Sequence, residues 1–123
     1  DYILFVPLHK KRLRQRGFNQ AEKIAMDLSK IVDIPTVDNI SRKYNTKRLY
    51  KLGKEERINE LKNAFMIKEN IIDLKNKNVL LVDDIFTTGS TVNEISKILK
   101  INGVNKVFVS TFLTRTDTFY VKA

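Results

Sequence analysis

The sequence predicts an α/β fold with a parallel β-sheet, and two observations support this prediction. Apolar stretches typical of buried strands alternate along the chain with segments whose apolar residues recur every three or four positions, as on one face of a helix. The clearest strand, residues 79–82, is apolar throughout, which indicates a strand that is covered on both faces. Asp83 and Asp84 follow it directly, at the end of the strand where open parallel sheets bind their ligands.

The other elements follow from local signals. Residues 18–32 carry apolar side chains at helical spacing with Asn19 as the N-cap, and Gly103 is placed to end a second helix. The expected order is a strand at 1–8, a basic loop to about 17, a helix at 18–32, a weak strand at 36–40, a polar stretch at 41–55, a short helix around 54–62, a strand near 64–67, the strand from 79, a helix at about 88–102 and a last strand at 106–114. The polar stretch is long for a loop of a compact domain, and such loops are usually functional or disordered.

The size of the chain fits a single domain, residues 1–123. It contains no cysteine, which excludes a disulfide framework and a Cys-based zinc site within this span. It also has no signal peptide and no apolar stretch of membrane-spanning length, so we expect a cytoplasmic protein. Because the chain begins at Asp1 and enters an apolar stretch at once, we expect it to be truncated at its N-terminus.

The positive charge of the chain is concentrated in two segments. The net charge is +9, and residues 9–16 hold five of the 23 Lys and Arg residues while residues 42–57 hold seven. Glu55 and Glu56 are the only acidic residues in either segment. Such clusters attract polyanions, and pyrophosphate, a phosphorylated sugar and nucleic acid are all candidates.

A turn suited to phosphate follows Asp83 and Asp84, which we call the acid pair. Backbone N–H groups, hydroxyl donors and the positive end of the next helix all favour a phosphate group at this turn. The turn consists of Thr87, Thr88, Gly89, Ser90 and Thr91. The acid pair suits sugar hydroxyls or a metal ion instead. Together the two features predict a pocket for a phosphorylated sugar.

Three alternatives could explain a hydrophobic strand that ends in aspartate. In a receiver domain this strand opens the domain and a later strand ends in the phospho-accepting Asp, but the next expected strand here, 106–114, carries no acid. A Walker B strand requires an upstream G-x-x-x-x-G-K-[ST] loop, which this sequence lacks. A solvated strand end is the third alternative, but two like charges at a buried strand end are unfavourable without a partner.

Residues 79–91 resemble the signature of the type I phosphoribosyltransferases, which have a Rossmann-like parallel-sheet core. In that family the acid pair hydrogen-bonds the ribose hydroxyls of phosphoribosyl pyrophosphate, and the Thr-Thr-Gly-Ser-Thr loop holds the 5-phosphate. The resemblance implies that Asp83 and Asp84 are catalytic and that residues 87–91 bind the substrate. It also implies Mg²⁺ as the cofactor, held through the substrate and water rather than by dedicated protein ligands, with Asp83 and Asp84 as the candidate protein contacts.

A second resemblance narrows the family. Residues 6–9 and 16–22, the latter with the sequence Arg-Gly-Phe-Asn-Gln-Ala-Glu, are similar to the motif of the ComF family, the competence protein F and its relatives. Residues 56–65 match that family as well, whereas Leu49 and Glu60 stand where it commonly has Gln and Asn. Family members often carry an N-terminal four-Cys zinc module. We expect this module to be absent here, together with the hood segments that set acceptor specificity.

The same resemblance implies that the segment after the first strand binds the pyrophosphate leaving group. Arg12 and Arg16 offer planar guanidinium groups for phosphate oxygens, and Gly17 allows the backbone to approach an anion closely. Residues 42–57 are expected to cover the leaving group. We expect Phe18 to be a core anchor at the start of the helix rather than a platform for base stacking.

Two functions stay open at this point. The first is transfer of the phosphoribosyl group of phosphoribosyl pyrophosphate to an unknown acceptor, with release of pyrophosphate. The second is a non-catalytic module that binds a phosphoribosyl compound, a nucleotide or single-stranded DNA and acts in competence and DNA uptake, with DNA-uptake proteins as partners. The sequence does not decide whether the chain is an enzyme, and it predicts neither the acceptor nor the oligomeric state.

Overall fold

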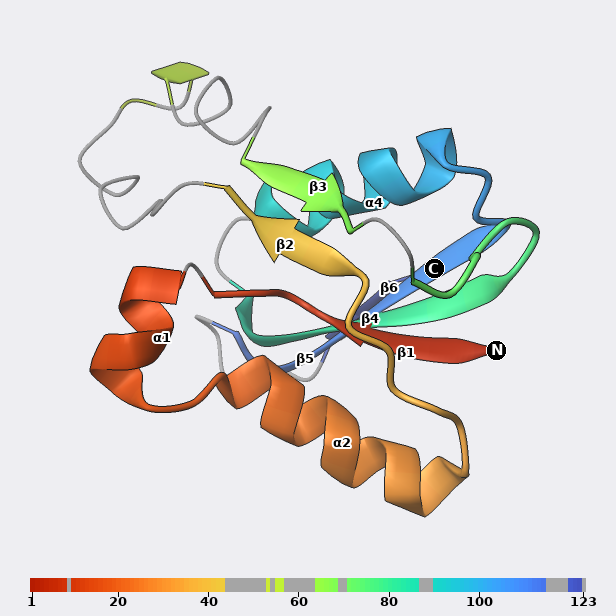
Figure 1. Cartoon of the computed structure of the whole chain (residues 1–123), viewed down its shortest axis with the longest axis horizontal. Helices are drawn as coiled ribbons and strands as arrows, with labels where there is room; N and C mark the ends of the chain where they lie inside the picture. The colour runs from red at the N-terminus through yellow and green to blue at the C-terminus, as the bar shows by residue number, and fades with distance from the viewer. Residues whose placement is uncertain are drawn as a thin grey trace.

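The computed structural model describes residues 1–8, 10–43, 53, 55–56, 64–68, 71–86, 90–114 and 120–122, and Figure 1 shows how its elements are arranged. The strands are β1 (Tyr2–Phe5), β2 (Ile40–Arg42), β3 (Phe65–Ile67), β4 (Asn78–Phe86), β5 (Lys106–Thr114) and β6 (Tyr120–Lys122). The helices are α1 (Lys10–Arg16), α2 (Gln20–Val32) and α4 (Ser90–Ile101).

The main sheet has the strand order β1-β4-β5-β6, in which the first three strands run parallel and β6 runs antiparallel to β5. The chain also passes along the other edge of β1, where Ile3 N donates to Pro35 O and Val37 N donates to Ile3 O, both at 2.9 Å. The connection through α2 thus leads from β1 to residues 35–37 on its outer edge, whereas the connection through α4 leads from β4 to β5 in the opposite direction across the sheet. In open α/β sheets, such a reversal of strand order marks the ligand-binding crevice.

Helices cover both faces of this sheet, with α2 on one face and α4 on the other, as Figure 1 shows. Ile3 and Phe5 of β1 pack in the core cluster that includes Ala25 of α2. The alternate residues Leu4 and Val6 belong to the larger cluster beneath α4. Because β1 is buried on both faces, its sequence is continuously apolar rather than alternating. The predicted parallel α/β class is confirmed.

Strands β2 and β3 form a separate two-stranded antiparallel sheet in which Arg42 pairs with Phe65. This hairpin packs on α4, and Phe65 is part of the core there. The strand expected at 64–67 is β3, which pairs with β2. Of the strand expected at 36–40, Thr36 forms an isolated parallel bridge with Ile3 at the edge of the main sheet, and only Ile40 belongs to β2.

Asn19 joins the start of α2 to the end of β1. Its Oδ1 accepts hydrogen bonds from Ala21 N at 3.0 Å and Glu22 N at 3.4 Å, and its Nδ2 donates to Val6 O at 3.1 Å. The predicted N-cap is confirmed. The same side chain also fixes the helix against the carboxyl edge of the sheet.

Three local predictions are wrong. The basic loop expected before residue 17 is the helix α1, because its Lys, Arg, Leu and Gln residues are good helix formers and Arg14 and Arg16 favour the negative end of the helix dipole. Strand β4 does not end before Asp83 but continues to Phe86, since its pairing with β5 continues. Strand β5 is not the last strand, because it is followed by the three-residue strand β6.

Two further expectations fall on parts of the chain that are described only in part. Of the helix expected around residues 54–62, residues 55 and 56 are helical, and the rest lies outside the described residues. Most of the polar stretch, residues 44–52, lies outside them as well. In the described part of the chain, no helix is both long enough and apolar enough to cross a membrane.

Candidate active site

The acid pair lies where β4 extends past the end of β1. The two strands pair only as far as Val82, whose carbonyl oxygen accepts a hydrogen bond from Val6 N at 2.9 Å. Asp83 and Asp84 come next, while the other edge of β4 still pairs with β5 and sets Asp83 opposite Thr111. The pair therefore occupies the carboxyl edge of the sheet at the point where the strand order reverses.

The pKa of Asp83 is raised from its ordinary value of 3.8 to about 7. Burial of the carboxyl group is the largest cause, and the negative charge of Asp84 and a side-chain hydrogen bond with it raise the pKa further. Two effects lower the pKa: Asp84 N donates to Asp83 Oδ1 at 2.9 Å, and the positive charge of Arg42 favours the ionised form. A strongly shifted carboxyl at the ligand-binding edge of a sheet is a candidate functional group.

The helix α4 begins at Ser90, shortly after the acid pair. Thr91 is partly buried in its first turn, and this turn contains no acidic residue that would neutralise the positive end of the helix. Thr87, Thr88 and Gly89 lie outside the described residues. The described part of this region agrees with a phosphate site, and the phosphate contacts stay a prediction.

The residues predicted to bind the leaving group lie on and just after α1. Arg12 is part of this helix, and Arg16 is its exposed last residue. Gly17 has a φ of +83°, a conformation that favours glycine, and its N–H donates to Leu13 O at 2.7 Å. Gly17 thus ends the helix, and its N–H is already used there. The contacts of Arg12, Arg16 and Gly17 with a leaving group stay predictions.

The structure adds two residues that the sequence did not single out. Arg42 places its guanidinium carbon 4.9 Å from the centroid of the Phe65 ring, and its positive charge lowers the pKa of Asp83. Thr111 is fully buried opposite Asp83, and its hydroxyl has no hydrogen-bond partner in the described part of the chain. In the sequence, Arg42 is one of seven basic residues in a polar stretch, and only the hairpin distinguishes it from the others.

Comparison with known proteins decides the family. The family model for the phosphoribosyl transferase domain matches residues 17–121, which is most of the chain. The chain belongs to the phosphoribosyltransferase domain family.

Relatives of known name confirm the resemblance to the ComF family. Competence protein F of Haemophilus influenzae is 41% identical over 110 residues, which cover 89% of this chain and 48% of the relative. The DNA utilization protein YhgH of Escherichia coli K12 is 34% identical over 89% of this chain and 47% of its own length. Competence protein ComFC of Bacillus subtilis is 31% identical over 76% of this chain and 36% of its own length. The chain spans about half the length of these relatives or less.

Solved structures agree on the fold of the phosphoribosyltransferase domain. A hypoxanthine phosphoribosyltransferase from Staphylococcus aureus matches with a TM-score of 0.55 and 19% identity over 92% of this chain and 52% of that chain. A hypoxanthine-guanine phosphoribosyltransferase from Bacillus anthracis matches with a TM-score of 0.57 and 16% identity over 93% of this chain and 57% of that chain. At these identities the matches show the fold alone, and it is the fold that the sequence predicts.

The acid pair of the phosphoribosyltransferase domain supplies two carboxylates that could contact a metal ion. Within the described residues, no group of three or more His, Cys, Asp or Glu side chains could hold a metal ion. Two adjacent carboxylates fit Mg²⁺, which usually keeps several waters and binds one or two carboxylates together with substrate phosphates. The residues thus fit a Mg²⁺ ion held mainly by the substrate, and its binding stays a prediction.

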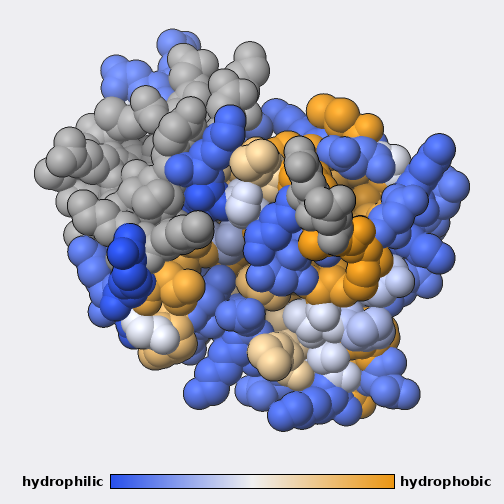
Figure 2. All heavy atoms as spheres, in the orientation of Figure 1, coloured by the Kyte–Doolittle hydropathy of each residue, from blue (hydrophilic) through white to orange (hydrophobic). Residues whose placement is uncertain are grey.

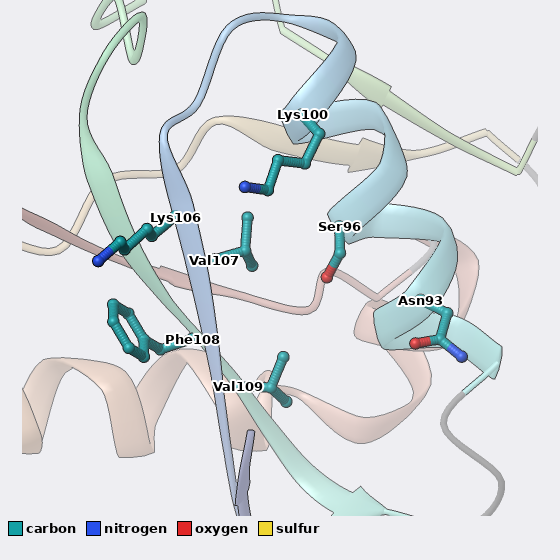
Figure 3. A pocket seen from close by; sticks show the side chains of 7 residues that line it. All are labelled: Asn93, Ser96, Lys100, Lys106, Val107, Phe108 and Val109. Atoms are coloured by element: carbon teal, nitrogen blue, oxygen red, sulfur yellow. The ribbon is translucent and has the colours of Figure 1, made fainter. Parts of the chain in front are cut away.

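One cavity of the domain lies between α4 and β5 and has a volume of about 430 Å³. Figure 3 shows the side chains that line it, which are Asn93, Ser96 and Lys100 of α4 and Lys106, Val107, Phe108 and Val109 of β5. None of the predicted site residues is among them. This cavity is therefore separate from the acid pair.

The junction of α1 and α2 exposes apolar side chains. Phe18 is 49% exposed, so the expectation that it anchors the core is wrong, because α2 buries Ala21 on its inner face instead. Leu13 and Met26 are exposed as well and line, with Phe18, a cavity of about 500 Å³. The ammonium group of Lys23 lies 6.0 Å from the centroid of the Phe18 ring. Figure 2 shows apolar side chains at the surface over α2, among hydrophilic ones.

Proposed function

We propose that the domain binds phosphoribosyl pyrophosphate (PRPP) together with Mg²⁺ and transfers its phosphoribosyl group to an acceptor, with release of pyrophosphate. The position of the acid pair carries this proposal. Two adjacent carboxylates lie at the carboxyl end of β4, where the strand order reverses, and α4 begins shortly after them. Carboxylates accept hydrogen bonds from neighbouring hydroxyls, and a helix N-terminus favours a phosphate group. Membership of the phosphoribosyltransferase domain family supports the same ligand.

In this proposal each part of the ligand has its own residues. Asp83 and Asp84 accept hydrogen bonds from the ribose hydroxyls. Residues 87–91 hold the 5-phosphate at the start of α4. Arg12 and Arg16 bind the pyrophosphate through guanidinium groups, which match phosphate oxygens in shape and charge.

The transfer breaks the bond between C1 of the ribose and an oxygen of pyrophosphate, and it forms a bond between C1 and an acceptor nitrogen. Pyrophosphate leaves with the electron pair of the broken bond, and the acceptor nitrogen releases its proton to water or to pyrophosphate. Positive charge develops at C1, and negative charge develops on the leaving group. The chain contributes by orienting the ribose through the acid pair and by placing positive charge near the leaving group. When bound, Mg²⁺ supplies further positive charge to the pyrophosphate oxygens.

Calorimetric titration with PRPP tests this proposal on the full-length natural protein. We expect saturable binding of PRPP that requires Mg²⁺ and is lost when a chelator removes the ion. Ribose 5-phosphate and pyrophosphate, each lacking part of the ligand, should bind more weakly than PRPP. Failure of PRPP to bind in the presence of Mg²⁺ would refute the proposed site. With binding established, pyrophosphate release in the presence of nitrogen acceptors tests the transfer itself.

A second candidate function is contact with single-stranded DNA in competence and DNA uptake, and the exposure of Phe18 favours it. Phe18 lies beside Lys23, and the last turn of α1 adds Arg14 and Arg16, which are exposed. An exposed aromatic ring among cations suits stacked bases and their phosphates. The names of the relatives, competence protein F and DNA utilization protein, are in keeping with this candidate.

Phe18→Ala is expected to weaken the binding of a fluorescent oligothymidylate roughly tenfold, because base–aromatic stacking contributes about 1–3 kcal/mol per base. Fluorescence anisotropy measures this affinity, which in the unaltered protein should fall steeply as salt is raised. Ile31→Ala is a matched control, since it removes an exposed apolar side chain of α2 elsewhere on the surface. Equal affinities of the Phe18→Ala variant and the unaltered protein would show that Phe18 is not a stacking platform.

A further inference from the structure

The two carboxyl groups of the acid pair lie on opposite faces of the main sheet. Successive side chains of a strand point to opposite faces, so every second residue shares a face. Leu81 packs in the core cluster beneath α4, and Val82 packs in the cluster beneath α2. Because the regular pairing of β4 with β5 continues past these residues, Asp83 lies on the α4 face and Asp84 on the α2 face. A residue that holds Asp83 therefore has to lie on the α4 face.

Thr111 of β5 is the neighbour of Asp83 on this face. The two residues are partners in the parallel pairing of β4 with β5. Val109, two residues before Thr111, packs in the cluster beneath α4, so Thr111 shares that face. On its other side Thr111 pairs with Tyr120 of β6. Adjacent strands lie about 4.8 Å apart, which puts the oxygens of an aspartate within reach of a neighbouring threonine hydroxyl, whereas the oxygen of a tyrosine lies at the far end of its ring.

The hydroxyl of Thr111 is an unused hydrogen-bond donor. The residue is fully buried, and its Oγ1 makes no hydrogen bond to any residue in the described part of the chain. Buried polar groups are nearly always paired, because an unpaired one has lost its hydrogen bonds to water. Asp83 Oδ1 accepts from Asp84 N at 2.9 Å instead. An unpaired donor thus lies beside a carboxyl group that is proposed to bind ribose.

We propose that Thr111 is a positioning residue whose hydroxyl donates a hydrogen bond to the carboxylate of Asp83 when the ribose of PRPP binds there. This inference rests on the proposed function. An ionised carboxylate accepts several hydrogen bonds, so Asp83 can bind Thr111, Asp84 N and a ribose hydroxyl together. Rotation about the Cα–Cβ bonds of the two side chains can form the new bond without moving either strand, because the strands are already paired. A bond that is made only in the complex favours the bound state and so adds to the affinity.

Thr111→Val removes the hydroxyl and keeps the shape of the side chain. We expect it to weaken PRPP binding about tenfold, the factor that corresponds to ~1.4 kcal/mol. The affinity for pyrophosphate, which has no ribose, should stay the same. Thr111→Ser keeps the hydroxyl and should bind PRPP nearly as the unaltered protein does, which separates the hydroxyl from the packing of the side chain. Calorimetry on the full-length natural protein with Mg²⁺ measures these affinities.

Thr36→Val is the matched control, because the hydroxyl of Thr36 already has a partner. Its Oγ1 donates to Ala25 O at 3.2 Å, and Thr36 lies beside Ile3 at the edge of β1 that faces away from β4 and β5. Thr36→Val should lower the Tm of the ligand-free protein, since a hydrogen bond is lost, and should leave the PRPP affinity unchanged. Thr111→Val should not lower this Tm, because its hydroxyl has no hydrogen bond to lose.

The comparison of Tm values separates this inference from the proposed function. A loss of Tm in Thr111→Val as large as that in Thr36→Val would show that the hydroxyl has a partner in the free protein, and the inference would then be wrong whether or not PRPP binds. An unchanged PRPP affinity in Thr111→Val, or an equal loss of PRPP and pyrophosphate binding, would overturn it as well. Failure of the unaltered protein to bind PRPP would overturn the proposed function and, with it, the role of Thr111 in holding a ribose-binding group.

Discussion

Replacing Asp83 and Asp84 together by asparagine is expected to abolish detectable PRPP binding. Each carboxylate is proposed to accept a charge-assisted hydrogen bond from a ribose hydroxyl, and losing one such bond costs about 1–3 kcal/mol. Each single variant should therefore weaken binding roughly five- to 150-fold, since 1.4 kcal/mol corresponds to about a factor of ten. Calorimetry with PRPP and Mg²⁺ measures the losses in the two single variants and in the double variant.

A matched control separates loss of the site from the gain of net charge. Asp27 and Asp33 are exposed residues of α2 and its C-terminal cap, and replacing both by asparagine changes the net charge by the same amount. Asp33 has a φ of 56°, a conformation that asparagine tolerates well. The control variant should bind PRPP as the unaltered protein does. Unchanged affinity in Asp84→Asn would remove Asp84 from the proposed ribose site.

The central sheet could be predicted because burial on both faces leaves a clear mark in the sequence. Residues 2–6 and 79–82 are continuously apolar, and only a strand that is covered on both sides requires this pattern. The helix α1 leaves no such mark, because Leu13 is its only apolar residue and the helix has no amphipathic period. Strand β6 has only three residues, and no alternation of apolar and polar residues in the sequence indicates it.

The acid pair could be predicted for a different reason, since its position depends only on the end of one strand and on the next helix. The environment of the pair could not be predicted in the same way. The charge of Arg42 lowers the pKa of Asp83, and Arg42 belongs to a hairpin that packs on α4; nothing local to residue 42 specifies that packing. The exposure of Phe18 could not be predicted for a similar reason, because it depends on where α2 begins.

Asp83→Asn is expected to stabilise the ligand-free protein, and more strongly at pH 8 than at pH 5. The pKa of Asp83 in the folded protein, about 7, lies above its ordinary value of 3.8, so the folded state binds the proton more tightly than the unfolded state does. The resulting stabilisation is fully present below about pH 4 and is lost as the pH rises through about 7. Above that pH the ionised, buried carboxyl destabilises the fold by a few kcal/mol, at ~1.4 kcal/mol for each unit of pKa shift.

Asparagine has the same shape as aspartate and cannot ionise, so it removes this effect while it keeps an oxygen that can accept the hydrogen bond from Asp84 N. Thermal unfolding at pH 5 and at pH 8 measures the gain in Tm over the unaltered protein. In Asp84→Asn the pKa of Asp83 should fall only part of the way to its ordinary value, because burial is the larger cause of the shift. A gain that is equal at the two pH values would show that folding does not perturb Asp83. A larger gain at pH 8, combined with the loss of PRPP binding, would identify Asp83 as a residue that weakens the fold and is retained for its ligand.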